Sequence, residues 1–242
     1  MNNFSKGEDQ FFIIGCQRSG ATLLELILNS HPNIQIIGDP NIFGRRYQIK
    51  EDIKLFGHKT LDLTHRYYFF KERYPRAKFL FLVRNVKSLI SSILNFYSWE
   101  FISRKIEESF WYISSSKFRR NLLEEFRGTK GDKLLELAFY IHNMFYIYEE
   151  YKREKLDILF IKYEHLIKNS QKEITRILNF LNLSWHSNTL KHHFFHKGVF
   201  NNGIDSQRSL DSSSLYLWKD KFTQNEINRI DNYLIYLKRL YN

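Results

Sequence analysis

The chain has one cysteine, three prolines and no apolar run long enough to cross a membrane. With Cys16 alone, no disulfide can form within the chain, so the sequence gives no support for an oxidising compartment. The first nine residues are polar where a signal peptide would be apolar. A bilayer-spanning helix needs about 20 apolar residues, and no stretch reaches that length. We therefore expect a cytoplasmic protein without a membrane span.

Acidic residues are in the minority, with 26 Asp and Glu against 37 Lys and Arg and a formal net charge of +11. This excess attracts polyanions but does not choose among phosphorylated ligands, nucleic acids and anionic membranes. The 242 residues, 43% of them hydrophobic, suffice for one well-buried domain, which we expect to span 1–242. Apolar strand-like runs alternate with amphipathic helical patterns, which predicts an α/β fold.

The most informative stretch is 11–24, an apolar run that leads into a glycine-bracketed loop and then into helix-forming residues. A strand, loop and helix in this order make an anion pocket, because the first N–H groups of the helix point back into the loop. The spacing from Gly15 to Gly20 is that of a Walker A loop, but Ala21 stands where an NTPase carries its lysine. A cation, Arg18, lies inside the loop instead. The loop therefore predicts an anion other than a triphosphate.

Two further strands are predicted to end in candidate ligand-binding residues. Residues 34–37 form a short strand that ends before Asp39, and 78–83 form a buried strand followed directly by Arg84. Open α/β sheets bind ligands at the carboxyl ends of their strands. Asp39 could equally be a turn residue before a proline, and Arg84 could be a surface arginine paired with a carboxylate.

The remaining segments give weaker signals. Residues 42–58 look irregular, 97–130 are interpreted as short helices forming a lid or acceptor wall, and 184–218 are loop-rich, with serines around Arg208. The aromatic residues of 97–130 could instead be ordinary core, and the serine-rich loop an ordinary linker. His192 and His196 could share a helix face, but no acidic or cysteine ligand lies near them in the sequence, so we predict no metal site.

Together these segments resemble the PAPS-dependent sulfotransferase family, closest to its bacterial and protein-tyrosine-sulfotransferase-like branch; PAPS is 3'-phosphoadenosine 5'-phosphosulfate. Segment 11–30 resembles the 5'-phosphosulfate loop and helix, although Ala21 stands where the family has Thr or Ser. Segment 78–97 is similar to the 3'-phosphate motif, with Arg-Asn-Val-Lys in place of Arg-Asp-Pro-Arg. Tyr163 resembles the tyrosine of the family's Tyr-Glu-Asp-Leu segment, and Lys219 the lysine of its C-terminal Trp-Lys pair. The resemblance implies a three-layer P-loop-type fold with a central, mostly parallel sheet flanked by helices.

The resemblance also implies where the donor would bind. Its 5' end would lie in the loop, its 3'-phosphate near the strand that ends before Arg84, and the loop of 184–218 would cover the nucleotide. The nucleotide-binding residues expected on this basis are Gly15, Gln17, Arg18, Ser19, Gly20, Ala21, Thr22, Leu23, Arg84, Ser92, Tyr163, Arg208, Ser209 and Lys219.

The resemblance implies the reaction as well. The family places an acidic base downstream of a His-Pro pair, and Asp39 stands in that register; His58 is the nearest other candidate. Lys59 resembles the family lysine that faces the sulfuryl group. Transfer would be an in-line displacement from PAPS to a hydroxyl or amine of a small organic acceptor, with Arg18 and Lys59 stabilising charge, no metal required and PAP, 3'-phosphoadenosine 5'-phosphate, as product.

Two other functions stay open on the sequence alone. One is an atypical P-loop nucleotide kinase or NTPase, which the missing lysine disfavours. The other is a basic nucleic-acid-binding protein without catalysis. The sequence contains no recognisable nucleic-acid-recognition module, which disfavours this function. Neither the acceptor nor the oligomeric state can be predicted from these residues.

Overall fold

The protein is described from a computed structural model, which covers residues 10–38, 52–111, 116–195, 210 and 212–240. The chain groups into two compact units. The first comprises Met1–Arg84 and Glu150–Ser212, and the second comprises Asn85–Glu149 and Ser213–Asn242.

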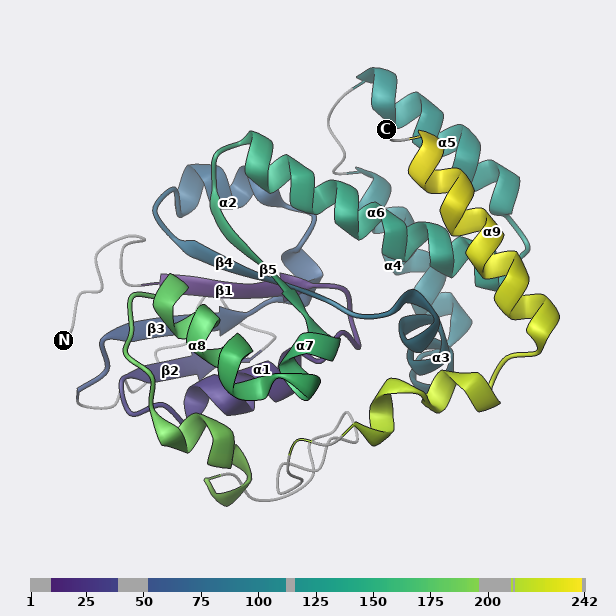
Figure 1. Cartoon of the computed structure of the whole chain (residues 1–242). Coiled ribbons are helices and arrows are strands. Elements are labelled where there is room, and N and C mark those ends of the chain that lie inside the picture. The colour runs from purple at the N-terminus through teal and green to yellow at the C-terminus, as the bar shows by residue number, and fades with distance from the viewer. Residues whose placement is uncertain (1–9, 39–51, 112–115, 196–209, 211, 241–242) are drawn as a thin grey trace. The chain divides into compact units, whose positions relative to one another are not determined.

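A five-stranded sheet forms the centre of the first unit (Figure 1). Each strand runs parallel to its neighbours, which confirms the predicted α/β class and parallel sheet. In spatial order the strands are β2 (Ile34–Ile37), β3 (Leu55–Lys59), β1 (Gln10–Gly15), β4 (Lys78–Val83) and β5 (Asp157–Lys162). Because all five strands point the same way, their carboxyl ends lie along one edge of the sheet.

Helices cover both faces of this sheet, as expected for buried parallel strands. On one face, Phe11 and Ile13 of β1 pack in a buried cluster with residues of α1 (Ala21–Asn29) and α8 (Ser170–Phe180). On the other face, Phe12 lies against an aromatic group that includes Phe70 of α2 (Tyr67–Arg73) and Phe79 of β4. These layers confirm the predicted three-layer arrangement.

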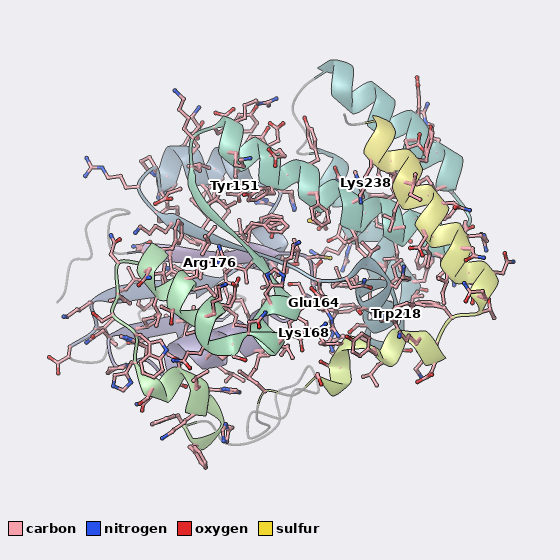
Figure 2. All side chains as sticks on the ribbon, viewed as in Figure 1. Tyr151, Glu164, Lys168, Arg176, Trp218 and Lys238 are labelled. Carbon is pink, nitrogen blue, oxygen red and sulfur yellow. The ribbon has the colours of Figure 1, made fainter. Side chains whose placement is uncertain are left out.

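Tyr151 connects the aromatic face of the sheet to Thr64. Tyr151, labelled in Figure 2, belongs to the last turn of α6 (Lys133–Arg153) and is fully buried. Its ring contacts Phe79, and its hydroxyl donates a hydrogen bond of 3.1 Å to the backbone oxygen of Thr64. Thr64 follows a short 3₁₀ segment, η1 (Leu61–Leu63). Two further helical segments complete this unit, α7 (Tyr163–Lys168) and η2 (Ser187–Phe194).

Strand β3 was not predicted, and the expectation that 42–58 is irregular is wrong for its last residues. Its sequence, Leu-Phe-Gly-His-Lys, contains a glycine and two polar residues, so it lacks the apolar signature of a buried strand. The strand forms because it lies between β1 and β2, where both of its backbone edges find partners. Residues 39–51 lie outside the described residues.

The second unit is helical. Its helices are α3 (Val86–Phe96), α4 (Trp99–Trp111), α5 (Ser116–Thr129), most of α6 and α9 (Gln224–Leu240), with 3₁₀ segments η3 (Ser213–Leu215) and η4 (Leu217–Asp220). The helices within 97–130 are longer than expected, at 13 and 14 residues. Asp132 caps the start of α6, since its Oδ1 accepts hydrogen bonds from the backbone N–H groups of Leu134 and Leu135. Across the described residues, none of the helices combines the length and apolarity needed to span a bilayer.

Candidate functional site

Thr64 holds the start of the loop that follows β1, at Gly15. The backbone N–H of Gly15 donates to Thr64 Oγ1 at 2.9 Å, and the same hydroxyl lies 2.9 Å from Gly15 O. Gly15 has φ +137°, and a Cβ built there would lie 2.3 Å from the backbone oxygen of Leu82 on β4. The loop thus leaves the sheet through a position that admits only glycine.

Helix α1 begins at the other end of the loop, and no side chain of its first turn caps its N-terminus or carries a negative charge. Its N-cap is Gly20, in a left-handed conformation, so no side chain caps the helix, and the first turn contains no acidic residue. The partial positive charge of the helix N-terminus is therefore not offset by α1 itself, which suits an anion. Arg18 also has a positive φ of 67°, so the loop is sharply turned on both sides of Ser19.

The hydroxyl of Ser19 is an unusual feature of this loop. The residue is fully buried, and its Oγ has no hydrogen-bond partner among the described residues. Its backbone N–H donates to Cys16 O at 3.3 Å. A buried hydroxyl without a protein partner costs free energy unless a ligand or water completes it. This observation fits a loop whose hydrogen bonding is completed by a bound anion.

The neighbouring loop residues are held by the protein itself. Gln17 Nε2 donates to Asp62 Oδ1 at 3.1 Å. Cys16 is buried, and burial raises the pKa of its thiol to about 12. Cys16 is therefore a packed small side chain and not a reactive thiolate.

Arg84 and Tyr163 lie at the carboxyl ends of β4 and β5, next to the loop. Because Val83 and Lys162 are register partners, the residues that follow them meet. The guanidinium carbon of Arg84 lies 4.5 Å from the centre of the Tyr163 ring, a cation–π contact, and Nη1 donates to Arg18 O at 3.4 Å. Burial lowers the pKa of Arg84, and its interactions with Tyr163 and Glu164 oppose that shift.

The Tyr163 ring in turn packs against Gly20. A Cβ added to Gly20 would lie 2.3 Å from Tyr163 Cδ2, so the ring occupies the space that any side chain there would need. The order of contact is Gly20, then Tyr163, then Arg84. The structure thus brings together three predicted nucleotide-binding residues from three different elements.

Lys59, at the end of β3, reaches α1. Its Nζ forms an ion pair of 2.6 Å with Glu25 Oε2 and lies 3.3 Å from Thr22 Oγ1. Both charged side chains are largely buried, with relative exposures of 15% for Lys59 and 12% for Glu25. Gly38, directly after β2, packs against this pair, since a Cβ there would lie 2.9 Å from Glu25 Oε1 and 3.5 Å from Lys59 Nζ.

Glu25 was missed by the sequence reasoning. The available signal was its setting, because it is the one charged residue in the nine-residue helix α1, and seven of those nine residues, Glu25 among them, are buried. A charged residue on a buried helix needs a partner of opposite charge nearby. Its position three residues after Thr22 also places it on the same side of the helix as that hydroxyl.

His58 does not share the site with Lys59, which corrects its selection as a candidate base. Successive side chains of a strand point to opposite faces of the sheet. The His58 ring stacks on Phe12 at 5.2 Å and contacts Phe56 at 4.9 Å, so it lies in the aromatic layer, away from α1. Burial there lowers its pKa to about 4.

Several predicted residues fall elsewhere. Asp39, Arg208 and Ser209 lie outside the described residues, as does His196. Ser92 lies on α3 and Lys219 on η4, both within the second unit. The expected contacts of Arg208, Ser209, Ser92 and Lys219 with a nucleotide therefore stay predictions.

Within the second unit, η4 is anchored to α3 and α9. Lys87 Nζ pairs with Asp231 and lies 5.1 Å from the centre of the Trp218 ring, while Lys219 Nζ lies over Tyr216 at 5.0 Å. Ser88 Oγ donates to Leu215 O at 3.4 Å. In the part of the chain that the structure describes, no group of three His, Cys, Asp or Glu side chains is arranged to hold a metal ion.

Comparison with known proteins identifies the class. The sulfotransferase domain family matches residues 8–237, and the chain belongs to that family. A Caenorhabditis briggsae protein, provisionally described as a protein-tyrosine sulfotransferase, is 20% identical over 288 aligned positions, which cover 99% of this chain and 90% of that protein.

Solved structures show the same fold at low identity. The sulfotransferase domain of the olefin synthase from Synechococcus PCC 7002 superposes with a TM-score of 0.59 at 13% identity, covering 96% of this chain and 97% of that one. Mouse sulfotransferase SULT7A1, solved in complex with PAP, gives a TM-score of 0.56 at 19% identity, covering 93% and 82%. These likenesses confirm the predicted P-loop-type α/β fold.

Proposed function

We propose that this chain transfers a sulfuryl group from PAPS to a hydroxyl or amine of a small organic acceptor. The observation that carries the proposal is the meeting of an uncapped helix N-terminus with an ammonium group. Thr22 in the first turn of α1 lies 3.3 Å from Lys59 Nζ. A loop of this kind accommodates the 5'-phosphosulfate, and the solved relative in complex with PAP supports a nucleotide of this class.

The chemistry needs positive electrostatics and positioning. In an in-line transfer of a sulfuryl group, negative charge grows on the oxygen that bridges to the 5'-phosphate. The amides of the loop, Arg18 and Lys59 would stabilise that charge, and the fully buried hydroxyl of Ser19 would gain a partner. Arg84, held on the Tyr163 ring, would bind the 3'-phosphate with Ser92.

Asp39 is proposed as the proton acceptor. It directly follows Gly38 in the sequence, and Gly38 packs against the Glu25–Lys59 pair. General base catalysis of this kind is worth about 10²–10⁴ in rate. The aromatic residues of 97–130 and the segment 184–218 would shape the acceptor and nucleotide sides.

The proposal is tested with PAPS and panels of alcohols, phenols and amines, with sulfated product detected by mass spectrometry. PAP binding is measured separately by calorimetry, with ATP and magnesium as the comparison ligand. Arg18→Ala should abolish transfer and weaken PAP binding, because the loop cation is lost. Asp39→Asn should lose turnover by about 10²-fold or more while PAP binding stays unchanged.

Some results would refute these assignments. Full transfer activity in the Arg18→Ala variant would overturn the assignment of the loop. Unchanged turnover in the Asp39→Asn variant would move the base to another residue. Preferential binding of magnesium-ATP over PAP would overturn the choice of donor.

A further inference from the structure

The ion pair between Glu25 and Lys59 places a carboxylate beside a site proposed to bind an anion. A buried carboxylate repels an anionic ligand and costs desolvation energy unless it is paired. A second ion pair in the same unit joins the buried carboxylate of Glu173 to Arg176, which is exposed and is labelled in Figure 2. Both residues lie within α8, and Arg176 also donates to Phe160 O at 2.7 Å.

A lysine on a strand end has four rotatable bonds, and its ammonium group is not positioned by its own backbone. Glu25 Oε2 at 2.6 Å and Thr22 Oγ1 at 3.3 Å together fix the Lys59 Nζ at the first turns of α1. The other carboxylate oxygen of Glu25, Oε1, lies close to Gly38, where an added Cβ would be 2.9 Å away. Residues of α1, of the end of β3 and of the position directly after β2 therefore surround one ammonium group.

We infer that Glu25 is a positioning residue, which holds the Lys59 ammonium at the mouth of the loop so that it meets the sulfuryl group without a conformational search. This inference rests on the proposed function. The carboxylate does not touch the donor in this assignment, and it acts through Lys59. Preorganisation of a charged group lowers the activation barrier of the transfer more than it strengthens donor binding.

The first test measures the position of Lys59 without any ligand. The wild-type chain and the variants Glu25→Gln, Glu25→Asp and Glu173→Gln are labelled with acetic anhydride, and the rate at Lys59 is measured by peptide mass spectrometry. Glu25→Gln should raise the labelling rate of Lys59 about fivefold, because the flexible side chain leaves its buried position. Glu173→Gln, the matched buried carboxylate, should leave that rate unchanged.

The second test measures transfer, on whichever acceptor the wild-type chain sulfates. Glu25→Gln should lower kcat about tenfold, with PAP affinity within about twofold of wild type. In a Lys59→Met background the same substitution should cause no further loss of kcat, because the residue that Glu25 positions is gone. Glu25→Asp keeps the charge one methylene further back, so it should be intermediate in both tests.

Clear outcomes overturn the inference. Equal Lys59 labelling in the wild-type and Glu25→Gln chains would do so, as would an equal fold-loss of kcat with and without Lys59. If Glu25→Gln does not fold, Glu25→Asp decides, and wild-type labelling together with wild-type kcat refutes the positioning role. A wild-type chain that binds neither PAP nor PAPS instead refutes the proposed function, while the labelling comparison still reports on the ion pair.

Discussion

Replacement of Gly20 by alanine tests how the loop, Tyr163 and Arg84 depend on one another. Two separate penalties apply at this position. Gly20 has φ +100°, and an L-residue in left-handed conformation costs about 1–2 kcal/mol. The added Cβ would also lie 2.3 Å from Tyr163 Cδ2, and overpacking of this kind costs about 1–3 kcal/mol. The expected loss in the free energy of unfolding is therefore about 2–5 kcal/mol.

Two other glycines separate these penalties. Gly131 has φ +94° but nothing within 4 Å of an added Cβ, so Gly131→Ala should show the backbone penalty alone, about 1–2 kcal/mol. Gly128, in α5, has neither problem, and Gly128→Ala should be neutral or stabilising by up to about 1 kcal/mol. Urea unfolding with far-UV circular dichroism measures all three variants.

The same substitution should also impair ligand binding. A displaced Tyr163 ring cannot support Arg84, so Gly20→Ala should weaken PAP binding in calorimetry while Gly131→Ala does not. In a Tyr163→Ala background, Gly20→Ala should cost only the backbone penalty, which gives a coupling of about 1–3 kcal/mol. A Gly20→Ala chain that is no less stable than Gly131→Ala would refute the close contact between the ring and the loop.

Three other predictions follow from the described side chains. Arg84→Ala should weaken PAP binding at least about tenfold, since a charged hydrogen bond is worth about 1.5–3 kcal/mol, and unchanged affinity would remove Arg84 from the nucleotide site. Burial lowers the pKa of His58 from 6.5 to about 4, so the folded state disfavours its protonation. The free energy of unfolding should therefore fall by about 3 kcal/mol as the pH drops from about 6.5 to 4, and by less in the His58→Leu variant. Urea unfolding at several pH values measures this difference. If His58→Leu shows the wild-type pH dependence, the histidine is not the titrating group. Cys16, with a pKa raised to about 12, should resist iodoacetamide at pH 8 in the native chain and react only after denaturation, and rapid native labelling would contradict its burial.

The sequence predicted the parts of the fold that have strong local signals. β1 and β4 are runs of buried apolar residues, and Asp132 is a helix cap whose side chain reaches the backbone N–H groups of the next turn. Thr223 and Glu226 have the spacing of a capping box, and hydrogen bonds of 2.8 and 3.3 Å in the two directions form it. These features depend on residues close together in the chain.

Other features depend on partners that are distant in the sequence. Ser170 and Glu173 have the spacing of a capping box, but no box forms, because Ser170 Oγ donates to Ile167 O and Glu173 pairs with Arg176. His58 and Lys59 are adjacent in sequence, and only the pairing of β3 with β1 shows that their side chains serve different layers. The ion pair of Glu25 with Lys59 joins residues 34 positions apart, which periodicity alone does not reveal.

The close packing of Gly38 on Glu25 has a consequence for how relatives of this chain can diverge. A larger residue at position 38 would meet Glu25 Oε1 at 2.9 Å, so the two positions are not free to change independently. In relatives that retain a long carboxylate at the position of Glu25, the residue equivalent to Gly38 should stay glycine. Where the carboxylate is replaced by a short side chain, that constraint is released, and the backbone that leads to Asp39 becomes open to substitution.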